Sequence, residues 1–306
     1  MPHVALESAS RHSRLTAAGD RWAAILATRP DLEPAFQLQQ RLLGLVGDLS
    51  DRLAERPLPR LSLPPRYLAA KLRSGTPALT GEPIPMPVTL LKPALLDLCD
   101  ALSKGGAAEA ADHIRDRISD GQMDAGSVLT ASLARDQQAI RTGAAHRGLS
   151  PDLLWLVAEL AASPFAHALQ RSLFATNDDT LYAALTEWSQ GYCAACGSWP
   201  ALAEVVGGHR TLRCSFCAFA WELTTYECVY CGEGGEKFVT AAPDSERMDQ
   251  RVEVCSSCGG YLKTLDLPAL SPFPLLAIAD LETMGVDVAT MEHGYARPPL
   301  KEFPRR

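Results

Sequence analysis

The sequence lacks the motifs that mark most enzyme active sites. It has no Gly-x-Gly-x-x-Gly following a strand, no Walker loop and no Gly-x-Ser-x-Gly turn. Its seven histidines are scattered over 306 residues, and no two of them stand four positions apart, which excludes a helical pair of metal-binding imidazoles. We therefore expect a protein that is not an enzyme.

Long apolar runs and an excess of positive charge are also missing. The longest apolar run, from Leu153 to Ala162, is too short to cross a bilayer and contains Glu159. The first residues, MPHVALESAS, contain no apolar signal segment, so we expect a cytoplasmic protein with no integral membrane segment. The formal charge of −7 disfavours nucleic acid as a partner, because an acidic chain gains nothing from counterion release.

Cysteine, in contrast, is concentrated in one region. Eight of the nine cysteines form four Cys-x-x-Cys pairs: Cys193 and Cys196, Cys214 and Cys217, Cys228 and Cys231, Cys255 and Cys258. Each such turn directs two sulfurs toward one point, and a tetrahedral metal needs four sulfurs. The pattern predicts two metal ions, each bound by four cysteines. The ninth, Cys99, is expected to be a small core residue.

The spacing indicates which pairs share a metal. Seventeen residues separate Cys196 from Cys214, and twenty-three separate Cys231 from Cys255. Each gap can hold two short strands and a hairpin, as in a zinc ribbon or a rubredoxin. The simplest prediction is two ribbons in tandem, and the alternative is a crossed arrangement in which the first pair joins the third.

Other uses of the cysteines fit less well. Disulfides require an oxidising compartment, and a catalytic dithiol needs only one such pair within a βαβ unit. Four thiolates leave no open position on a metal, so the sites are not hydrolytic. Zinc would cross-link the region and stabilise its fold, whereas iron could also transfer an electron. The cysteine spacing does not distinguish the two metals. The paired turns favour a single ion over an iron–sulfur cluster.

The residue after each cysteine pair bears on the shape of the turn. Gly197, Gly232 and Gly259 follow three of the pairs and suit a position that needs positive φ. Ala218 follows Cys217, so that turn is expected to be strained or differently shaped. Four aromatic residues at or near the turns are expected to fill the small ribbon core rather than to shield the sulfurs: Phe216, Phe219, Trp221 and Tyr230.

Residues 1–187 are predicted to form a mainly helical domain, because apolar residues recur there at helical spacing. Residues 57–88 are rich in proline and predict an extended surface connection with a short helix at Arg66–Leu72. Ser150-Pro151 and Ser163-Pro164 each resemble a helix start, which predicts two successive helices.

Residues 188–270 differ in composition, because they are rich in cysteine and glycine and contain short β-prone runs. They predict two modules, at about 190–225 and 226–266. Residues 271–306 predict one closing helix, in LLAIADLETM, and a tail. The predicted fold class is α+β, with a helical N-terminal domain followed by two tandem rubredoxin-like or zinc-ribbon metal modules.

Four segments resemble the formate dehydrogenase accessory protein family, FdhE: CAACGSWPALAEV, CSFCAFAWELTTYECVYCGE, EVCSSCGGYLKTLDL and LLAIADLETM. The resemblance implies a cytoplasmic assembly factor with two rubredoxin-like metal centres, with iron favoured. It also implies binding to the catalytic subunit of respiratory formate dehydrogenase, which needs the factor to become active. Among the residues, the resemblance assigns only the eight paired cysteines, as metal ligands.

Three hypotheses follow. The first is a non-enzymatic maturation factor that uses its two four-cysteine centres to support a client. The second is a rubredoxin-like electron-transfer or redox-sensing protein. The third is a nucleic-acid-binding zinc ribbon, which the acidic charge disfavours.

Overall fold

The computed structural model describes residues 10–59, 61, 63–175, 178–242 and 249–301. The chain forms two compact units, and the segments of the two units alternate along the sequence. One unit contains Arg11–Ser62 and Gly81–Leu173, and the other contains Leu63–Thr80 together with the chain from Phe174 onward. The predicted combination of helices with a sheet that carries two four-cysteine groups is confirmed. The domain boundaries at residues 187 and 270 stay predictions.

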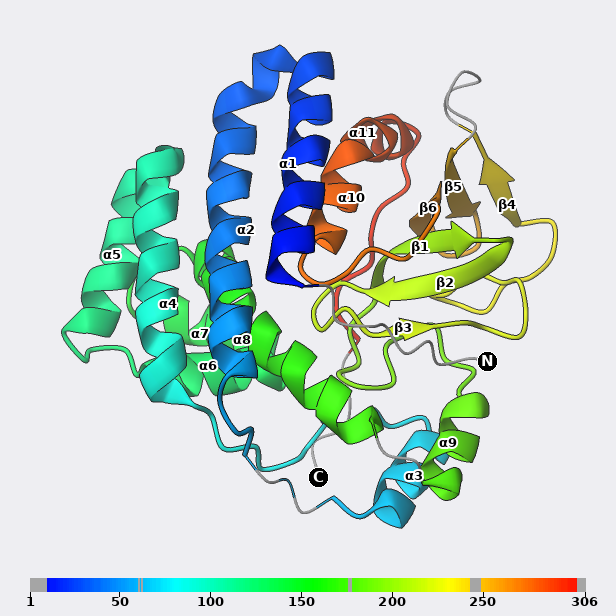
Figure 1. The fold of residues 1–306 in the computed structure, drawn as a ribbon, viewed down its shortest axis with the longest axis horizontal. Coiled ribbons are helices and arrows are strands. Elements are labelled where there is room, and N and C mark those ends of the chain that lie inside the picture. The colour runs from blue at the N-terminus through cyan, green and yellow to red at the C-terminus, as the bar shows by residue number, and fades with distance from the viewer. Residues whose placement is uncertain (1–9, 60, 62, 176–177, 243–248, 302–306) are drawn as a thin grey trace. The chain divides into compact units, whose positions relative to one another are not determined.

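The first unit is helical (Figure 1). Its elements are α1 (Arg11–Thr28), the 3-10 turn η1 (Pro30–Leu32), α2 (Glu33–Ala54), α4 (Val88–Leu102), the π turn η2 (Ser103–Ala107), α5 (Ala108–Ser119), α6 (Ala125–Leu133), α7 (Gln137–Ala145) and most of α8 (Pro151–Phe174). Apolar side chains at helical spacing, such as Leu91, Leu95 and Leu98 of α4, are fully buried in its core. The same spacing of apolar residues in the sequence was the basis for predicting helices in this part of the chain.

The predicted break at Ser163-Pro164 is wrong, because α8 runs through Pro164 without interruption. A proline at this position cannot donate a hydrogen bond to the carbonyl of Leu160, four residues earlier. The hydroxyl of Ser163 donates to that carbonyl instead, at 3.3 Å. Ala162 and Phe165 on either side are buried, so packing favours a continuous helix.

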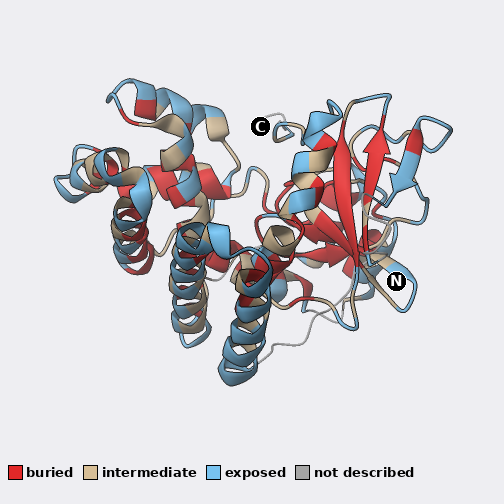
Figure 2. Cartoon of the chain, turned by 90° about the horizontal axis from the view of Figure 1, so that it is seen from above, coloured by how far each residue is buried: buried red, intermediate tan, exposed pale blue. Residues whose placement is uncertain are grey.

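Within its described residues, the second unit contains a six-stranded sheet and four helices. Its strands are β1 (Pro200–Val206), β2 (His209–Cys214), β3 (Ala220–Trp221), β4 (Phe238–Ala241), β5 (Gln250–Cys255) and β6 (Tyr261–Asp266). Its helices are α3 (Pro65–Arg73), α9 (Asp179–Thr186), α10 (Leu276–Glu282) and α11 (Met284–Glu292). The strands are mostly buried (Figure 2).

The sheet has the order β3-β2-β1-β6-β5-β4 and is built from two equivalent halves (Figure 1). Within each half, neighbouring strands are antiparallel. The halves join through β1 and β6, which run parallel, with Ala203 opposite Thr264. The two predicted ribbons are therefore fused into one sheet, and the second half repeats the first by translation along it.

One face of the sheet is covered by the C-terminal helices. Leu276 and Ala279 of α10 pack against Leu202 and Leu265, and Val286 of α11 packs against Val252 and its neighbours. The predicted closing helix is present as α10, but it ends at Thr283, where φ is −106° and ψ is 19°, and a second helix, α11, follows that was not predicted. The hydroxyl of buried Thr283 donates to the Ala279 carbonyl at 2.9 Å, which satisfies the end of α10.

The proline-rich segment is more than a surface connection. The predicted short helix is present as α3, but the residues after it are buried against the first cysteine turn. The N–H groups of Ala78 and Leu79 donate to the carbonyls of Ala194 and Ala195, at 2.8 and 2.9 Å. Composition could not predict this contact, because the proline content indicates extended backbone but not what the backbone packs against.

Candidate metal centres

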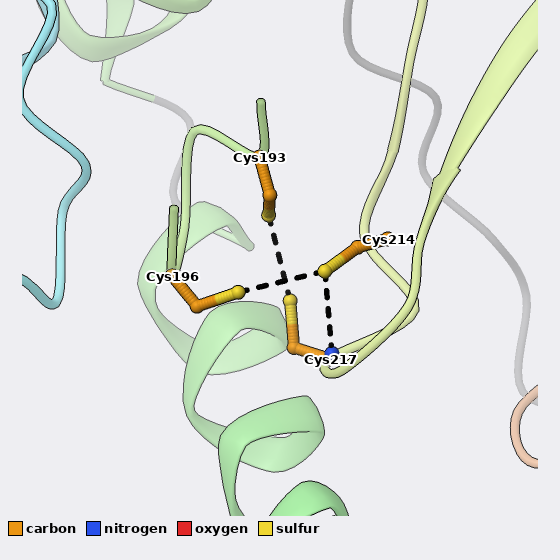
Figure 3. Close-up of side chains that lie close together, drawn as sticks. All are labelled: Cys193, Cys196, Cys214 and Cys217. Carbon is orange, nitrogen blue, oxygen red and sulfur yellow. Dashed lines mark hydrogen bonds between the residues drawn. The ribbon is translucent and has the colours of Figure 1, made fainter. Parts of the chain in front are cut away.

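The first four-cysteine group lies between two turns of the first half of the sheet. Cys193 and Cys196 come from the turn before β1, and Cys214 and Cys217 from the turn that ends β2. The four sulfurs point toward a common centre (Figure 3). The sulfur of Cys193 lies 3.6 Å from that of Cys217, and the sulfur of Cys196 lies 3.5 Å from that of Cys214.

The second group repeats this arrangement in the second half of the sheet. Cys228 and Cys231 precede β4, and Cys255 and Cys258 form the turn between β5 and β6. The Cys228 and Cys258 sulfurs are 3.7 Å apart, and those of Cys231 and Cys255 are 3.6 Å apart. The structure thus groups the cysteines as the adjacent pairing predicts, and not as the crossed alternative does.

None of the nine cysteines, all of which lie in the described residues, forms a disulfide. A disulfide would require sulfurs about 2.05 Å apart. Around a metal with metal–sulfur bonds of about 2.3 Å, tetrahedral geometry places the sulfurs about 3.8 Å apart. The observed separations are close to that value, so the donor set and its spacing fit a tetrahedral zinc or iron ion at each centre. The geometry does not distinguish the two metals.

The four turns share one backbone design. In each, the N–H of the first cysteine donates to the carbonyl five residues later, at 2.9 Å, as from Cys214 to Phe219. The residue after the second cysteine has positive φ in every turn, including Ala218 at 55°. Of the two alternatives predicted for the Cys217 turn, the strained one is confirmed, because Ala218 carries a Cβ at positive φ. The methyl of Ala218 is buried with Leu202 and Leu276, which gives a packing reason for alanine at a position where glycine is easier to accommodate.

The two centres differ in their access to solvent. All four cysteines of the first centre are buried, whereas Cys231 and Cys258 of the second centre are exposed. Burial raises the pKa of the Cys193 and Cys217 thiols well above the ordinary value. These thiols would hold their protons until a divalent cation displaced them, so metal binding at the first centre would be coupled to proton release.

Side chains near the turns mostly fill the ribbon core, as expected. Phe216, Phe219 and Trp221 are almost completely buried, and Tyr230 packs beside Cys228 and Cys255. The sequence did not single out Tyr192 and Trp199, whose rings lie edge to face at 5.9 Å. Trp199 in turn lies 5.2 Å from Tyr230, so aromatic rings in contact extend from the first centre to the second. Both residues are close in sequence to Cys193 or Cys196, which is the signal that could have indicated them.

A buried charge beside the first centre was also missed. Arg213 precedes Cys214 and is fully buried in an ion pair with Glu204. Its guanidinium also donates to the Ser271 carbonyl at 2.7 Å. Strand alternation could have placed Glu204 and Arg213 on one face of the sheet, but not under α10.

No helix in the described part of the chain is long and apolar enough to cross a membrane. No family model matches the chain. The chain is 34% identical over 115 residues to a protein FdhE homolog of Edwardsiella ictaluri, an alignment that covers 36% of this chain and 37% of the relative. It is also 34% identical over 119 residues to a protein FdhE homolog of Pseudomonas aeruginosa, covering 36% of this chain and 38% of the relative. These alignments span little more than a third of the curated relatives.

The fold is similar over a longer range. The crystal structure of the FdhE protein from Pseudomonas aeruginosa superposes with a TM-score of 0.60 and 22% identity, covering 98% of this chain and 97% of that one. The resemblance predicted from the cysteine-rich segments is thus confirmed: this chain is similar to FdhE proteins in sequence over about a third of its length, and in fold over nearly all of it.

Proposed function

We propose that this protein is a non-enzymatic accessory factor of the FdhE type, which acts in the cytoplasm. It binds the catalytic subunit of respiratory formate dehydrogenase and supports the assembly or activation of that subunit. The observation that carries the proposal is the pair of four-cysteine centres within a fold similar to an FdhE protein. A centre with four protein sulfurs leaves no position for a substrate, which favours a structural or electron-carrying role over catalysis.

The eight cysteines are proposed as the ligands of two metal ions. Cys193, Cys196, Cys214 and Cys217 would hold one ion, and Cys228, Cys231, Cys255 and Cys258 the other. Iron is favoured by the resemblance and zinc is the alternative. Either ion would offset part of the thiolate charge and fix the turns at the ends of β2 and β5, and iron would add a one-electron couple.

The test is binding to the formate dehydrogenase catalytic subunit of the same organism. The purified chain should retain that subunit on an affinity column, and deletion of its gene should lower formate dehydrogenase activity in cells. A variant in which serine replaces all eight cysteines of the centres should not retain the subunit, and it should not restore formate dehydrogenase activity to the deletion strain. The matched control is Cys99→Ser, the same change at the one cysteine outside the centres, which should do both. Full client activity with the eight-serine variant would refute the metal-dependent part of the proposal.

The exposure of Cys231 and Cys258 favours a second function, electron transfer through the second centre. A partner could approach this centre closely, whereas the first centre is enclosed. If this function holds, aerobically purified protein should be red, and dithionite should bleach the colour reversibly. Colourless protein with two zinc ions would rule it out and leave the accessory function standing.

A further inference from the structure

The outer edge of β4 ends the sheet, and no strand pairs with it among the residues that the structure describes (Figure 1). Val239 is 49% exposed, and Thr240 and Ala241 are also exposed. The strand has the sequence FVTA, without the charged residue or proline that usually protects a sheet edge from pairing with another chain.

The internal repeat of the sheet indicates what kind of segment this edge can bind. Ala203 of β1 pairs with Leu212, two residues before Cys214, and Thr240 of β4 pairs with Glu253, two residues before Cys255. Thr240 is therefore the counterpart of Ala203 in the second half.

In the first half, the edge at Ala203 is covered. There β6 lies parallel to β1, with Thr264 opposite Ala203. The pairing continues past the end of β6, where the N–H of Leu267 donates to the Val205 carbonyl at 2.9 Å. The equivalent edge in the second half has no such strand within the described residues.

The backbone of β4 presents hydrogen-bonding groups at this edge. The Ser256 N–H donates to the Lys237 carbonyl at 2.8 Å, so these two residues form a hydrogen-bonded pair of the β4–β5 ladder. Such pairs alternate along antiparallel strands, which directs the N–H and C=O of Val239 toward β5 and those of Thr240 outward. Thr240 thus offers a donor and an acceptor to an added strand.

We propose that the outer edge of β4 is the docking site for the client protein, which adds an extended segment as a seventh strand, parallel to β4 and hydrogen-bonded to Thr240. The inference rests on the proposed function for the identity of the client. An extended segment is the occupant because β6 occupies the equivalent edge in that form. The edge of a second copy is a poorer fit, since the opposite end of the sheet, β3, has only two residues and both are buried.

The docking edge depends on the second metal centre. Phe238, the first residue of β4, packs with Cys228 and Cys255. The chain reaches β4 from the Cys228–Cys231 turn, and β5 ends in Cys255. Metal at this centre would therefore hold β4 in place, and the first centre would have little influence on the edge.

The test uses the full chain with its metals and the formate dehydrogenase catalytic subunit. Thr240→Pro removes the outward N–H without removing a hydrogen bond to β5, and edge strands tolerate proline at such positions. The matched control, Thr240→Val, loses the same hydroxyl contact with Tyr226 but keeps the N–H. Thr240→Pro should weaken client binding about tenfold or more, whereas Thr240→Val should bind like the native chain.

Three further measurements test the interpretation: the stability and metal content of the variants, the binding of a charged variant, and hydrogen exchange. Both variants should retain the native unfolding temperature and metal content, and Val239→Lys, which places a charge on the edge while leaving the ladder intact, should also weaken binding. In the native complex, the amide of Thr240 should become protected from hydrogen exchange. If Thr240→Pro binds as tightly as Thr240→Val, or if β4 pairs instead with a second copy in a dimer that Thr240→Pro dissociates, the docking site is overturned while the accessory function stands. If the native chain does not bind the subunit at all, the proposed function fails and the docking site with it.

Discussion

Arg213 and Glu204 form an ion pair in which neither side chain has exposed surface. The pair lies on the sheet face under α10, where Glu204 also accepts from the Ser271 N–H at 3.1 Å. Removing one member leaves the other as an uncompensated buried charge. Glu204→Leu should therefore lower the free energy of unfolding by about 3–5 kcal/mol.

The double variant Glu204→Leu, Arg213→Met separates the ion pair from packing. Because it removes both charges, it should recover most of the loss, and chemical denaturation at constant metal loading measures the difference. If the double variant were less stable than Glu204→Leu, the loss of stability in Glu204→Leu could not be attributed to the unpaired buried charge of Arg213.

The left-handed positions after the cysteine pairs give a second prediction. At Gly232, where φ is 76°, an added Cβ would meet no atom within 4 Å, so Gly232→Ala should cost about 1–2 kcal/mol through backbone strain alone. Ala218→Gly should change stability by less than about 1 kcal/mol, because relief of similar strain is offset by loss of a buried methyl. Thermal unfolding of the two variants side by side tests this contrast, and equal losses would contradict it.

Asp124 gives a prediction that involves no metal ligand. Its carboxylate caps α6 by accepting from the Ser127 N–H at 2.7 Å, and Asp124→Ala should cost about 1 kcal/mol at pH 7. Hydrogen bonds from the Ser127 hydroxyl and N–H lower the pKa of Asp124 below its ordinary value of 3.8. A lowered pKa means that the carboxylate contributes stability above the ordinary pKa and loses it as the pH falls through the lowered one.

The stability difference between the native chain and Asp124→Ala should therefore shrink below about pH 4. Asp124→Asn retains a capping oxygen without a titratable charge and should be nearly as stable as the native chain at pH 7. Chemical denaturation of the three proteins between pH 3 and pH 7 provides the comparison. A constant difference between the native chain and Asp124→Ala would disprove the titration.

The unequal burial of the two centres predicts unequal metal release. A chelator should remove one equivalent of metal quickly, and the remaining equivalent slowly, because only the second centre has exposed cysteine residues. When the first equivalent has left, iodoacetamide should label Cys231 and Cys258 before any cysteine of the first centre, as peptide mass spectrometry will determine. Simultaneous loss of both equivalents would indicate that the centres open together.

Local spacing was enough to predict the centres, because a Cys-x-x-Cys turn fixes the direction of its two sulfurs within four residues. The hairpin lengths then favoured the observed pairing of turns. What the sequence did not reveal depends on contacts between distant segments. Leu79 reaches the turn at Ala195 across more than a hundred residues, and β6 joins β1 in parallel although β2 to β5 intervene.

The errors in the helices have a similar cause. Ser163-Pro164 carries the local signal of a helix start, but buried neighbours and the hydroxyl of Ser163 keep α8 continuous. In the C-terminal region, the predicted helix ends at the buried Thr283, and the second helix that follows it was not predicted. In both places tertiary packing outweighs the local preference.

Metal content per chain tests the central claim most directly. Elemental analysis of anaerobically purified protein, combined with its visible spectrum, should find two iron or zinc ions per native chain. Exchange of Cys193 and Cys196 for serine should leave one ion, and so should exchange of Cys228 and Cys231. A native chain that carries no tightly bound metal, or one whose metal content is unchanged by either double exchange, would contradict the two four-cysteine centres.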